Sequence, residues 1–325
     1  MIDRKDRVID YLRISVTDRC NLRCVYCMPE EGVESIPHSQ ILSFDEIVRI
    51  CRIMAEDGLK KIKLTGGEPL VRRGIVSLVR QLKAVPGIEQ VTITTNGVLL
   101  PEMAKDLAEA GIDAVTVSPD TVKRERFAAI ARRDELDKVL EGIRVMNTEC
   151  PQVPLKLNCV LQSDEDDLLA VAEYARNNPI HVRFIEVMPI GYGQQMEFRD
   201  EAWLKNLLES RFGTLTPYEK VLGNGPAVYY SAEGFQGKIG FISAVSHKFC
   251  HKCNRVRLTS DGFMKSCLQY ETGVRLKEAM VAGCSDEELR EMIHQAIAMK
   301  PAGHQFEKTE TFEGQEVRTM SQIGG

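Results

Sequence analysis

Six cysteines stand in two groups of three whose spacing suits metal coordination. The first group has the spacing C-x3-C-x2-C and consists of Cys20, Cys24 and Cys27; the second has the spacing C-x2-C-x13-C and consists of Cys250, Cys253 and Cys267. Closely spaced thiolates can bind zinc or an iron–sulfur core. Because three thiolates leave one iron of a four-iron core without a protein ligand, each group could present an open metal position to a small molecule.

The spacing alone does not decide between the two metals. A zinc ion would need a fourth ligand, which a distant His could supply to the first group. For the second group the candidates are His247, His251 and Cys284. Cys51, Cys150, Cys159 and Cys284 lie in apolar segments, where a buried structural thiol is the expected role.

Basic residues in the expected strands indicate a second kind of chemistry. Alternate residues of a strand share a face, so Arg13, Lys63 and Lys156 lie on polar faces, opposite apolar neighbours such as Leu12 and Ile14. Arg183 extends this set, and Arg255 and Arg257 are expected on the loop of the second cysteine group. Buried cations need anionic partners, and guanidinium groups suit phosphate. A nucleoside triphosphate is therefore favoured, the alternative being that Glu68, Asp120 and Glu186 neutralise these cations as structural ion pairs.

A repeated pattern predicts the elements that carry these residues. Gly58, Gly87 and Gly111 each precede a turn and a β-branched run, which is typical of a helix end followed by a buried strand. Helices are expected over 43–57 and 101–110, and further strands over 11–16, 155–161 and 181–187. The fold class is therefore α/β: an open, partial βα TIM-type barrel of about six strands. Residues 1–200 would form this barrel, and residues 201–325 a smaller C-terminal α+β domain covering its mouth.

Composition excludes several classes of protein. The chain has 325 residues, 43% of them hydrophobic, and a net charge of −5. The negative charge disfavours general binding to nucleic acid or to an anionic membrane. No apolar run is long enough to span a bilayer, and the first residues do not resemble a signal peptide. The expected location is the cytoplasm.

The first cysteine group resembles that of the radical S-adenosylmethionine (radical SAM) enzymes. The loop C-x3-C-x2-C follows the first strand, and an aromatic residue, Tyr26, precedes the third cysteine. The segment Thr65-Gly66-Gly67-Glu68-Pro69 resembles the GGEP motif of that family. The resemblance implies a [4Fe-4S] cluster on the first group, which binds S-adenosyl-L-methionine and cleaves it to methionine and a 5′-deoxyadenosyl radical.

The C-terminal part resembles one branch of that superfamily, the GTP 3′,8-cyclase family of molybdenum cofactor biosynthesis. The matching features are Asn224-Gly225-Pro226-Ala227, the stretch from Phe249 to Thr259, the third cysteine at 267 and the Gly324-Gly325 terminus. The resemblance implies a second [4Fe-4S] cluster on Cys250, Cys253 and Cys267 that binds the guanine of GTP. It implies that the radical abstracts the ribose 3′-hydrogen and that C3′ bonds to guanine C8, which gives 3′,8-cyclo-7,8-dihydro-GTP.

The resemblance also assigns binding residues, position by position. The implied contacts to S-adenosylmethionine are Tyr26, Gly67, Ser118 and Met188. The implied contacts to GTP are Arg13, Lys63, Thr94, Lys156, Arg183, Arg255, Val256 and Arg257. The terminal glycines would thread into the active site. Two departures from the family pattern are Pro119-Asp120 after Ser118, where Leu-Asp is usual, and Ala131-Arg132 after Ile130, where Thr-Gly is common.

Partners follow from the same resemblance. A reductant protein such as flavodoxin or ferredoxin would supply electrons, and cyclic pyranopterin monophosphate synthase would act next in the pathway. A homodimer is compatible with the sequence, which does not determine the oligomeric state. The alternatives are a radical SAM enzyme that modifies peptides and, in another class, a zinc-binding scaffold without catalysis.

Overall fold

A computed structural model describes residues 1–162, 164–306 and 312–324. The strands are β1 (Tyr11–Ser15), β2 (Lys61–Thr65), β3 (Gln90–Thr95), β4 (Ala114–Val117), β5 (Leu155–Val160), β6 (His181–Ile185), β7 (Thr216–Tyr218), β8 (Val228–Ser231), β9 (Ile239–Ile242), β10 (Arg255–Leu258), β11 (Phe263–Lys265) and β12 (Gly273–Arg275). The α-helices are α1 (Phe44–Glu56), α2 (Ile75–Lys83), α3 (Leu100–Glu109), α4 (Arg124–Ala131), α5 (Leu136–Glu149), α6 (Glu165–Asn177), α7 (Glu201–Phe212), α8 (Leu276–Val281), α9 (Asp286–Ala298) and α10 (Met320–Ile323). Short 3-10 turns occupy His38–Gln40, Pro69–Val71, Gly191–Gln195 and Cys250–Lys252.

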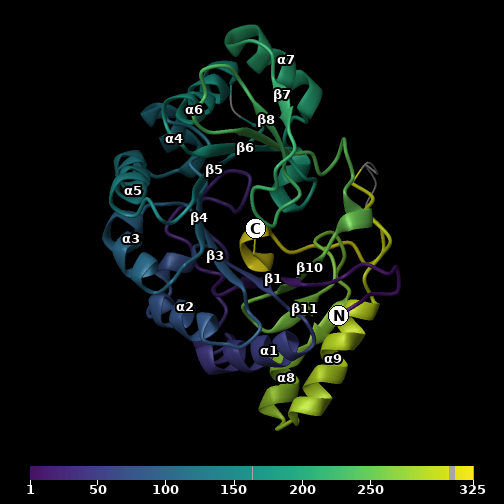
Figure 1. Cartoon of the computed structure of the whole chain (residues 1–325). Helices are drawn as coiled ribbons and strands as arrows, with labels where there is room; N and C mark the ends of the chain where they lie inside the picture. The colour runs from purple at the N-terminus through teal and green to yellow at the C-terminus, as the bar shows by residue number, and fades with distance from the viewer. Residues whose placement is uncertain (163, 307–311, 325) are drawn as a thin grey trace.

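One sheet runs through the molecule, in the order β12-β11-β10-β1-β2-β3-β4-β5-β6-β9-β8-β7. Strands β1 to β6 pair in parallel with their sequence neighbours, which confirms the predicted six-stranded open βα unit. The sheet curves around a central space, with α1 to α6 on its outer side (Figure 1). The barrel does not close, because β12 and β7 form the two ends of the strand order and do not pair with each other within the described residues.

The C-terminal half contributes to the same sheet. Strand β10 pairs in parallel with β1, and β9 pairs in parallel with β6, so both edges of the six-stranded unit are extended by strands from beyond residue 200. The expectation that Arg255 and Arg257 lie on a loop is wrong, because both belong to β10. The division into residues 1–200 and 201–325 stays a prediction.

The predicted helix ends and strand faces explain why the sheet folds this way. Gly58, Gly87 and Gly111 have φ of 98°, 88° and 85°, the left-handed conformation that closes a helix. The apolar strand residues form the core against the outer helices; Leu12, Ile14, Ile62, Leu64, Val115, Val117, Leu155 and Leu157 are all buried. Their polar neighbours therefore face the concave side. None of the described helices is long and apolar enough to span a membrane.

Candidate functional site

The first cysteine triplet lies on the loop that follows β1, as predicted. Two backbone hydrogen bonds tie this loop to the end of α4: Arg23 N donates to Ala131 O at 2.9 Å and Val25 N donates to Ile130 O at 3.0 Å. The Cys27 amide donates to Cys24 O at 2.9 Å, which gives the loop a tight turn between these two cysteines. These hydrogen bonds hold the loop at the mouth of the barrel.

The three thiols of this loop affect one another electrostatically. Burial raises the pKa of Cys20 to about 11 and that of Cys27 to about 12. Burial also raises the pKa of Cys24, and the charges of Asp120, Cys27 and Cys20 add to that effect. Without a metal these thiols are therefore protonated at neutral pH, whereas a bound metal cation deprotonates a thiol that coordinates it. The three thiols together form a donor set that fits an iron–sulfur core.

Within the described ranges, no three His, Cys, Asp or Glu side chains are arranged to hold a metal ion together. A four-iron core has a different requirement, because each thiolate binds a separate iron.

The Gly66-Gly67 turn packs directly on the cysteine loop. A Cβ atom on Gly67 would lie 2.4 Å from Arg19 O and 2.6 Å from Asp18 O, so a side chain cannot fit there. Gly67 N donates to Thr17 O at 2.7 Å. Glu68 is buried behind this turn and accepts hydrogen bonds from Thr95 Oγ1 and Asn96 N, while burial raises its pKa to about 7. The second strand therefore ends at the same mouth as the first cysteine group.

Asn96 is a site residue that the sequence analysis did not single out. Its side-chain amide donates to Cys20 Sγ at 3.7 Å and to Asn21 Oδ1 at 2.8 Å. The signal that could have identified it is its position directly after β3, where a parallel sheet places functional loops.

The four predicted S-adenosylmethionine contacts all follow strands at this mouth, and each stays a prediction. Tyr26 donates its hydroxyl to Asp120 Oδ2 at 2.5 Å beside Cys24. Ser118 follows β4, and its amide donates to Thr95 O at 3.0 Å. Met188 follows β6 and packs against a small apolar cluster formed by Ile190, Phe306 and Ile323.

The two departures from the family pattern lie beside the first triplet. After Pro119, Asp120 has a φ of 57°, and Thr121 N closes the turn by donating to Pro119 O at 2.7 Å. Arg132 has a φ of 53°, in the region where glycine is easiest to place. Its guanidinium donates to Met28 O at 3.0 Å and to Arg23 O at 3.3 Å. At this position the side chain thus secures the cysteine loop.

Six cations line the concave face, and we call them the basic cluster: Arg13, Lys63, Lys156, Arg183, Arg255 and Arg257. In the parallel register Arg13 stands directly beside Lys63 on one side and Arg257 on the other. Burial, followed by the charges of Arg183 and Arg13, lowers the pKa of Lys63 well below its usual value. Burial and the charge of Arg13 likewise lower the pKa of Arg257 to about 9. This face is therefore strongly positive and poorly solvated.

Neutral groups hold part of the basic cluster in place. Lys63 Nζ lies 3.4 Å from Thr94 Oγ1, the predicted substrate contact on β3. Arg183 donates to Asn158 Oδ1 at 2.9 Å and to Thr116 Oγ1 at 3.1 Å. Arg255 has a buried Nε with no hydrogen-bond partner among the described residues. The partners of Lys63 and Arg183 are uncharged, and the Arg255 Nε has none among the described residues, so positive charge remains available to an anion.

The predicted alternative, in which acids neutralise the basic cluster as structural ion pairs, is not supported for Glu68 and Glu186. Glu186 is buried and accepts hydrogen bonds from the amides of Glu201, Val245 and Ser246. In the described part of the chain, neither Glu68 nor Glu186 forms a salt bridge with the basic cluster. Asp120 accepts hydrogen bonds from Tyr26 and from Val160 N.

Val256 differs from the other predicted substrate contacts. Its side chain is fully buried in the hydrophobic core, on the face of β10 opposite Arg255 and Arg257. A contact between Val256 and a ligand would therefore use main-chain atoms.

Cys250 and Cys253 of the second triplet lie just before β10, and Cys267 follows β11. Cys253 N donates to Cys250 O at 3.1 Å. The pKa of Cys250 is raised mainly by burial and further by the negative charges of Cys267 and Cys253. Burial alone would raise the pKa of Cys253, but the positive charges of Lys300 and Arg255 lower it to about 7. Of the candidate fourth ligands, Cys284 packs against the core near α9, and its carbonyl accepts a hydrogen bond from Arg49.

The C-terminal tail reaches the basic cluster. Gly324 O accepts a hydrogen bond from Arg257 Nη1 at 2.7 Å, and a Cβ atom on Gly324 would lie 2.8 Å from Thr65 Oγ1. The side chain of Ser321 hydrogen-bonds to Cys27. Figure 1 accordingly shows α10, the last helix of the chain, near the centre of the curved sheet. Gly325, the second glycine of the predicted tail, lies outside the described residues.

Comparisons with family models match most of the chain. Residues 14–175 match the Radical SAM superfamily, and residues 180–306 match Molybdenum Cofactor Synthesis C. A protein of Clostridium perfringens (strain SM101 / Type A), named GTP 3′,8-cyclase, is 45% identical over 329 residues that cover 100% of both chains. A protein of the same name from Moorella thermoacetica is 42% identical over 329 residues, again covering 100% of both chains.

Solved structures support the fold. Streptococcus suis SuiB bound to S-adenosylmethionine superposes with a TM-score of 0.61 at 17% identity, covering 83% of this chain and 64% of that chain. SuiB bound to its precursor peptide SuiA gives a TM-score of 0.59 at 14% identity, covering 91% of this chain and 66% of that chain. At these identities the likeness concerns the fold alone.

The buried cations predict a pH dependence of stability in the metal-free protein. Burial, followed by the charge of Arg183, lowers the pKa of Lys156 from 10.5 to about 8. Between these two pH values the unfolded chain binds more protons than the folded chain, so this residue makes the free energy of unfolding rise with pH. We therefore expect the free energy of unfolding of wild type to rise relative to that of Lys156→Met as the pH is raised from about 8 to 10.5. Urea unfolding followed by circular dichroism measures this difference.

The exposed Lys220 provides the matched control. Lys220→Met should follow the wild-type stability curve across the same pH range. A Lys156→Met curve that runs parallel to wild type from pH 8 to pH 10.5 would contradict the burial of this cation.

Proposed function

The chain belongs to the GTP 3′,8-cyclase family of radical SAM enzymes, and we propose that it converts GTP to 3′,8-cyclo-7,8-dihydro-GTP in molybdenum cofactor biosynthesis. The observation that carries this proposal is the register of the basic cluster, which places Arg257, Arg13 and Lys63 side by side on three neighbouring strands. These cations lie on the concave face between the two cysteine triplets. A triphosphate is an anion of the right charge for this surface.

The cofactors supply the radical chemistry. A [4Fe-4S] cluster held by Cys20, Cys24 and Cys27 would supply the electron for cleavage of S-adenosylmethionine, the source of the 5′-deoxyadenosyl radical that would take the ribose 3′-hydrogen. We propose that Tyr26, Gly67, Ser118 and Met188 hold S-adenosylmethionine near that cluster. This assignment is supported by the position of each residue after a strand end at the same mouth.

The residues of the chain have the task of positioning GTP. We propose that Arg13, Lys63, Lys156 and Arg183 bind the triphosphate, with Thr94 orienting the Lys63 ammonium group. A second [4Fe-4S] cluster on Cys250, Cys253 and Cys267 would bind the guanine, and Arg255, Val256 and Arg257 would contact the nucleotide beside it. Fixing both ends of the nucleotide brings C3′ close to C8, and such positioning lowers the barrier to bond formation.

The contacts of Gly324 support a role for the C-terminal tail in closing the site. Gly324 lies against Thr65 and Ser15 at the ends of β2 and β1, where a side chain would not fit. The hydrogen bond from Arg257 to Gly324 O joins the tail to the basic cluster. We propose that the tail restricts access of water to the bound nucleotide.

Electron supply and product transfer require further proteins. We propose a reductant protein such as flavodoxin or ferredoxin, since cleavage of S-adenosylmethionine consumes an electron. Cyclic pyranopterin monophosphate synthase would act on the product. The cytoplasmic location, the absence of nucleic-acid and membrane binding, and the homodimer stay predictions.

An anaerobic assay tests the activity. Reconstituted protein given GTP, S-adenosylmethionine and a strong reductant should form 5′-deoxyadenosine and a cyclised nucleotide in equal amounts, both detected by chromatography and mass spectrometry. Formation of 5′-deoxyadenosine without any cyclised nucleotide would contradict the proposal and favour the alternative, a radical SAM enzyme that modifies peptides.

Metal analysis tests the second cluster. Wild type should hold about eight irons with matching sulfide, and a variant with Cys250, Cys253 and Cys267 all changed to Ala should hold about four. Cys284→Ala is the matched control and should keep the wild-type iron content. About two zinc ions and no iron would instead support the non-catalytic scaffold.

The triphosphate assignment predicts a selective loss of affinity. Lys63→Met removes one charged donor, which is worth roughly 1.5–3 kcal/mol, so GTP binding should weaken by about 10- to 100-fold in anaerobic calorimetry. Guanosine binding should change little, because guanosine carries no phosphate. Lys60→Met, next to β2 but paired with Glu89 at the surface, should leave both affinities unchanged. Equal weakening for GTP and guanosine would refute the role of Lys63.

A further inference from the structure

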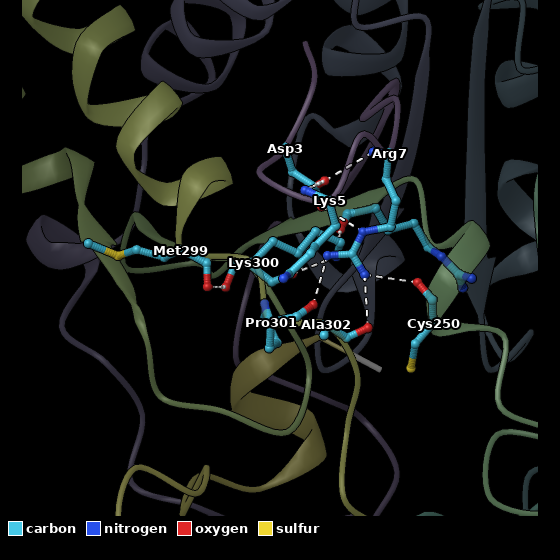
Figure 2. A network of polar contacts seen from close by, with 10 residues as sticks. Asp3, Lys5, Arg7, Cys250, Met299, Lys300, Pro301 and Ala302 are labelled. Carbon is cyan, nitrogen blue, oxygen red and sulfur yellow. Dashed lines mark hydrogen bonds and ion pairs between the residues drawn. The ribbon is translucent and has the colours of Figure 1, made fainter.

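The N-terminal segment contacts the second cysteine triplet through one buried arginine. Arg7 is separated from Cys250 by 243 residues in the sequence, yet its Nη1 donates to Cys250 O at 2.9 Å. The same guanidinium donates to Pro301 O at 2.7 Å and to Ala302 O at 3.3 Å. Figure 2 shows the guanidinium between these three carbonyls, with the sulfur of Cys250 pointing away from it.

A buried carboxylate fixes the orientation of this guanidinium. Asp3 Oδ2 accepts from Arg7 Nε at 2.6 Å, and both side chains are buried. Asp3 Oδ1 is held in turn by the amides of Lys5 and Arg7 at 2.8 and 3.0 Å. A planar guanidinium held at one edge presents its other donors in a fixed direction, which a lysine ammonium cannot do.

A second buried cation ties the other two cysteines to the same segment. Lys300 Nζ donates to Arg255 O at 2.6 Å, two residues after Cys253, and to Ser266 O at 2.8 Å, one residue before Cys267. Lys300 immediately precedes the Pro301-Ala302 pair that Arg7 contacts. The backbone near all three cysteines is therefore fastened to the stretch Lys300 to Ala302, which follows α9.

We propose that Asp3, Arg7 and Lys300 form a brace that sets the spacing of the three thiols for the second cluster, with Arg7 and Lys300 as positioning residues. The inference rests on the proposed function, since it requires a cluster on the second triplet. The brace joins three parts of the chain, namely the N-terminal segment, the β10 region and the stretch after α9. Arg7 contacts only backbone carbonyls near the cluster, so the Cys250 thiol stays available to iron, whereas Lys300 also hydrogen-bonds to the side chain of Cys253.

Arg7→Lys is the informative variant, because it keeps the charge beside Asp3 and loses the fork of donors. The test is best made in the full chain with Cys20, Cys24 and Cys27 changed to Ala, in which the second triplet alone holds iron. That parent should take up about four irons, and its electron paramagnetic resonance signal should shift when GTP is added. With Arg7→Lys we expect at least half of this iron to be lost on anaerobic gel filtration, and the GTP-dependent shift to disappear.

Two further variants separate positioning from folding. Lys300→Met should show the same two losses, whereas Arg4→Gln, at an exposed neighbour of the brace, should keep both the iron and the shift. With all natural cysteines present, Arg7→Lys should keep about four irons on the first triplet and a wild-type circular dichroism spectrum.

The outcomes distinguish the brace from the proposed function. Full iron and an unchanged GTP-dependent signal in both Arg7→Lys and Lys300→Met would overturn the brace alone. Loss of both clusters together from Arg7→Lys would also overturn it, because the effect would not be selective for the second triplet. A parent chain that binds no iron would overturn the second cluster itself, and the brace with it.

Discussion

Repulsion among six cations on one concave face is the constraint on which the rest of the structure depends. Like charges that lie close together in a poorly solvated place repel one another, and here Arg13, Lys63 and Arg257 stand at one level on adjacent strands. The buried acids Glu68 and Glu186 accept hydrogen bonds from backbone amides and hydroxyl groups. This repulsion destabilises the folded state. Burial of the apolar face of the same strands against the outer helices offsets it. An anion that enters the concave side would relieve the repulsion, which supports the proposed affinity of this face for a triphosphate.

The sheet also explains how two cysteine groups that are distant in the sequence come to lie near one basic cluster. The first triplet follows β1, and the second flanks the antiparallel pair of β10 and β11, of which β10 pairs with β1 in parallel. Pairing of these two strands brings Arg257 beside Arg13 and places both cysteine groups around the same basic cluster. The C-terminal half is therefore part of the barrel wall, and Gly324 contacts the ends of β1 and β2 from within.

Several features could be predicted because they are written in short stretches of sequence. Glycine before a β-branched run marked the ends of helices and the starts of strands, and the alternation of Arg13 and Lys63 with apolar residues assigned each face correctly. The role of Asn96 beside Cys20 was not predicted, because an asparagine in a loop has no periodic neighbours that reveal what it contacts. Arg132 was noticed only as a departure from a pattern, and its hydrogen bonds to the cysteine loop became visible in three dimensions.

The sequence by itself determined the two thiol triplets, the six parallel strands and the cationic character of their concave face, since spacing and period-two alternation are local properties of the chain. The tertiary structure alone decided that β9 and β10 extend the sheet on both sides, that Arg255 and Arg257 sit on a strand, and that Arg7 reaches Cys250. Such contacts depend on which distant segments pack together, and the free energy of that packing comes from the whole buried surface. No short stretch of sequence encodes it.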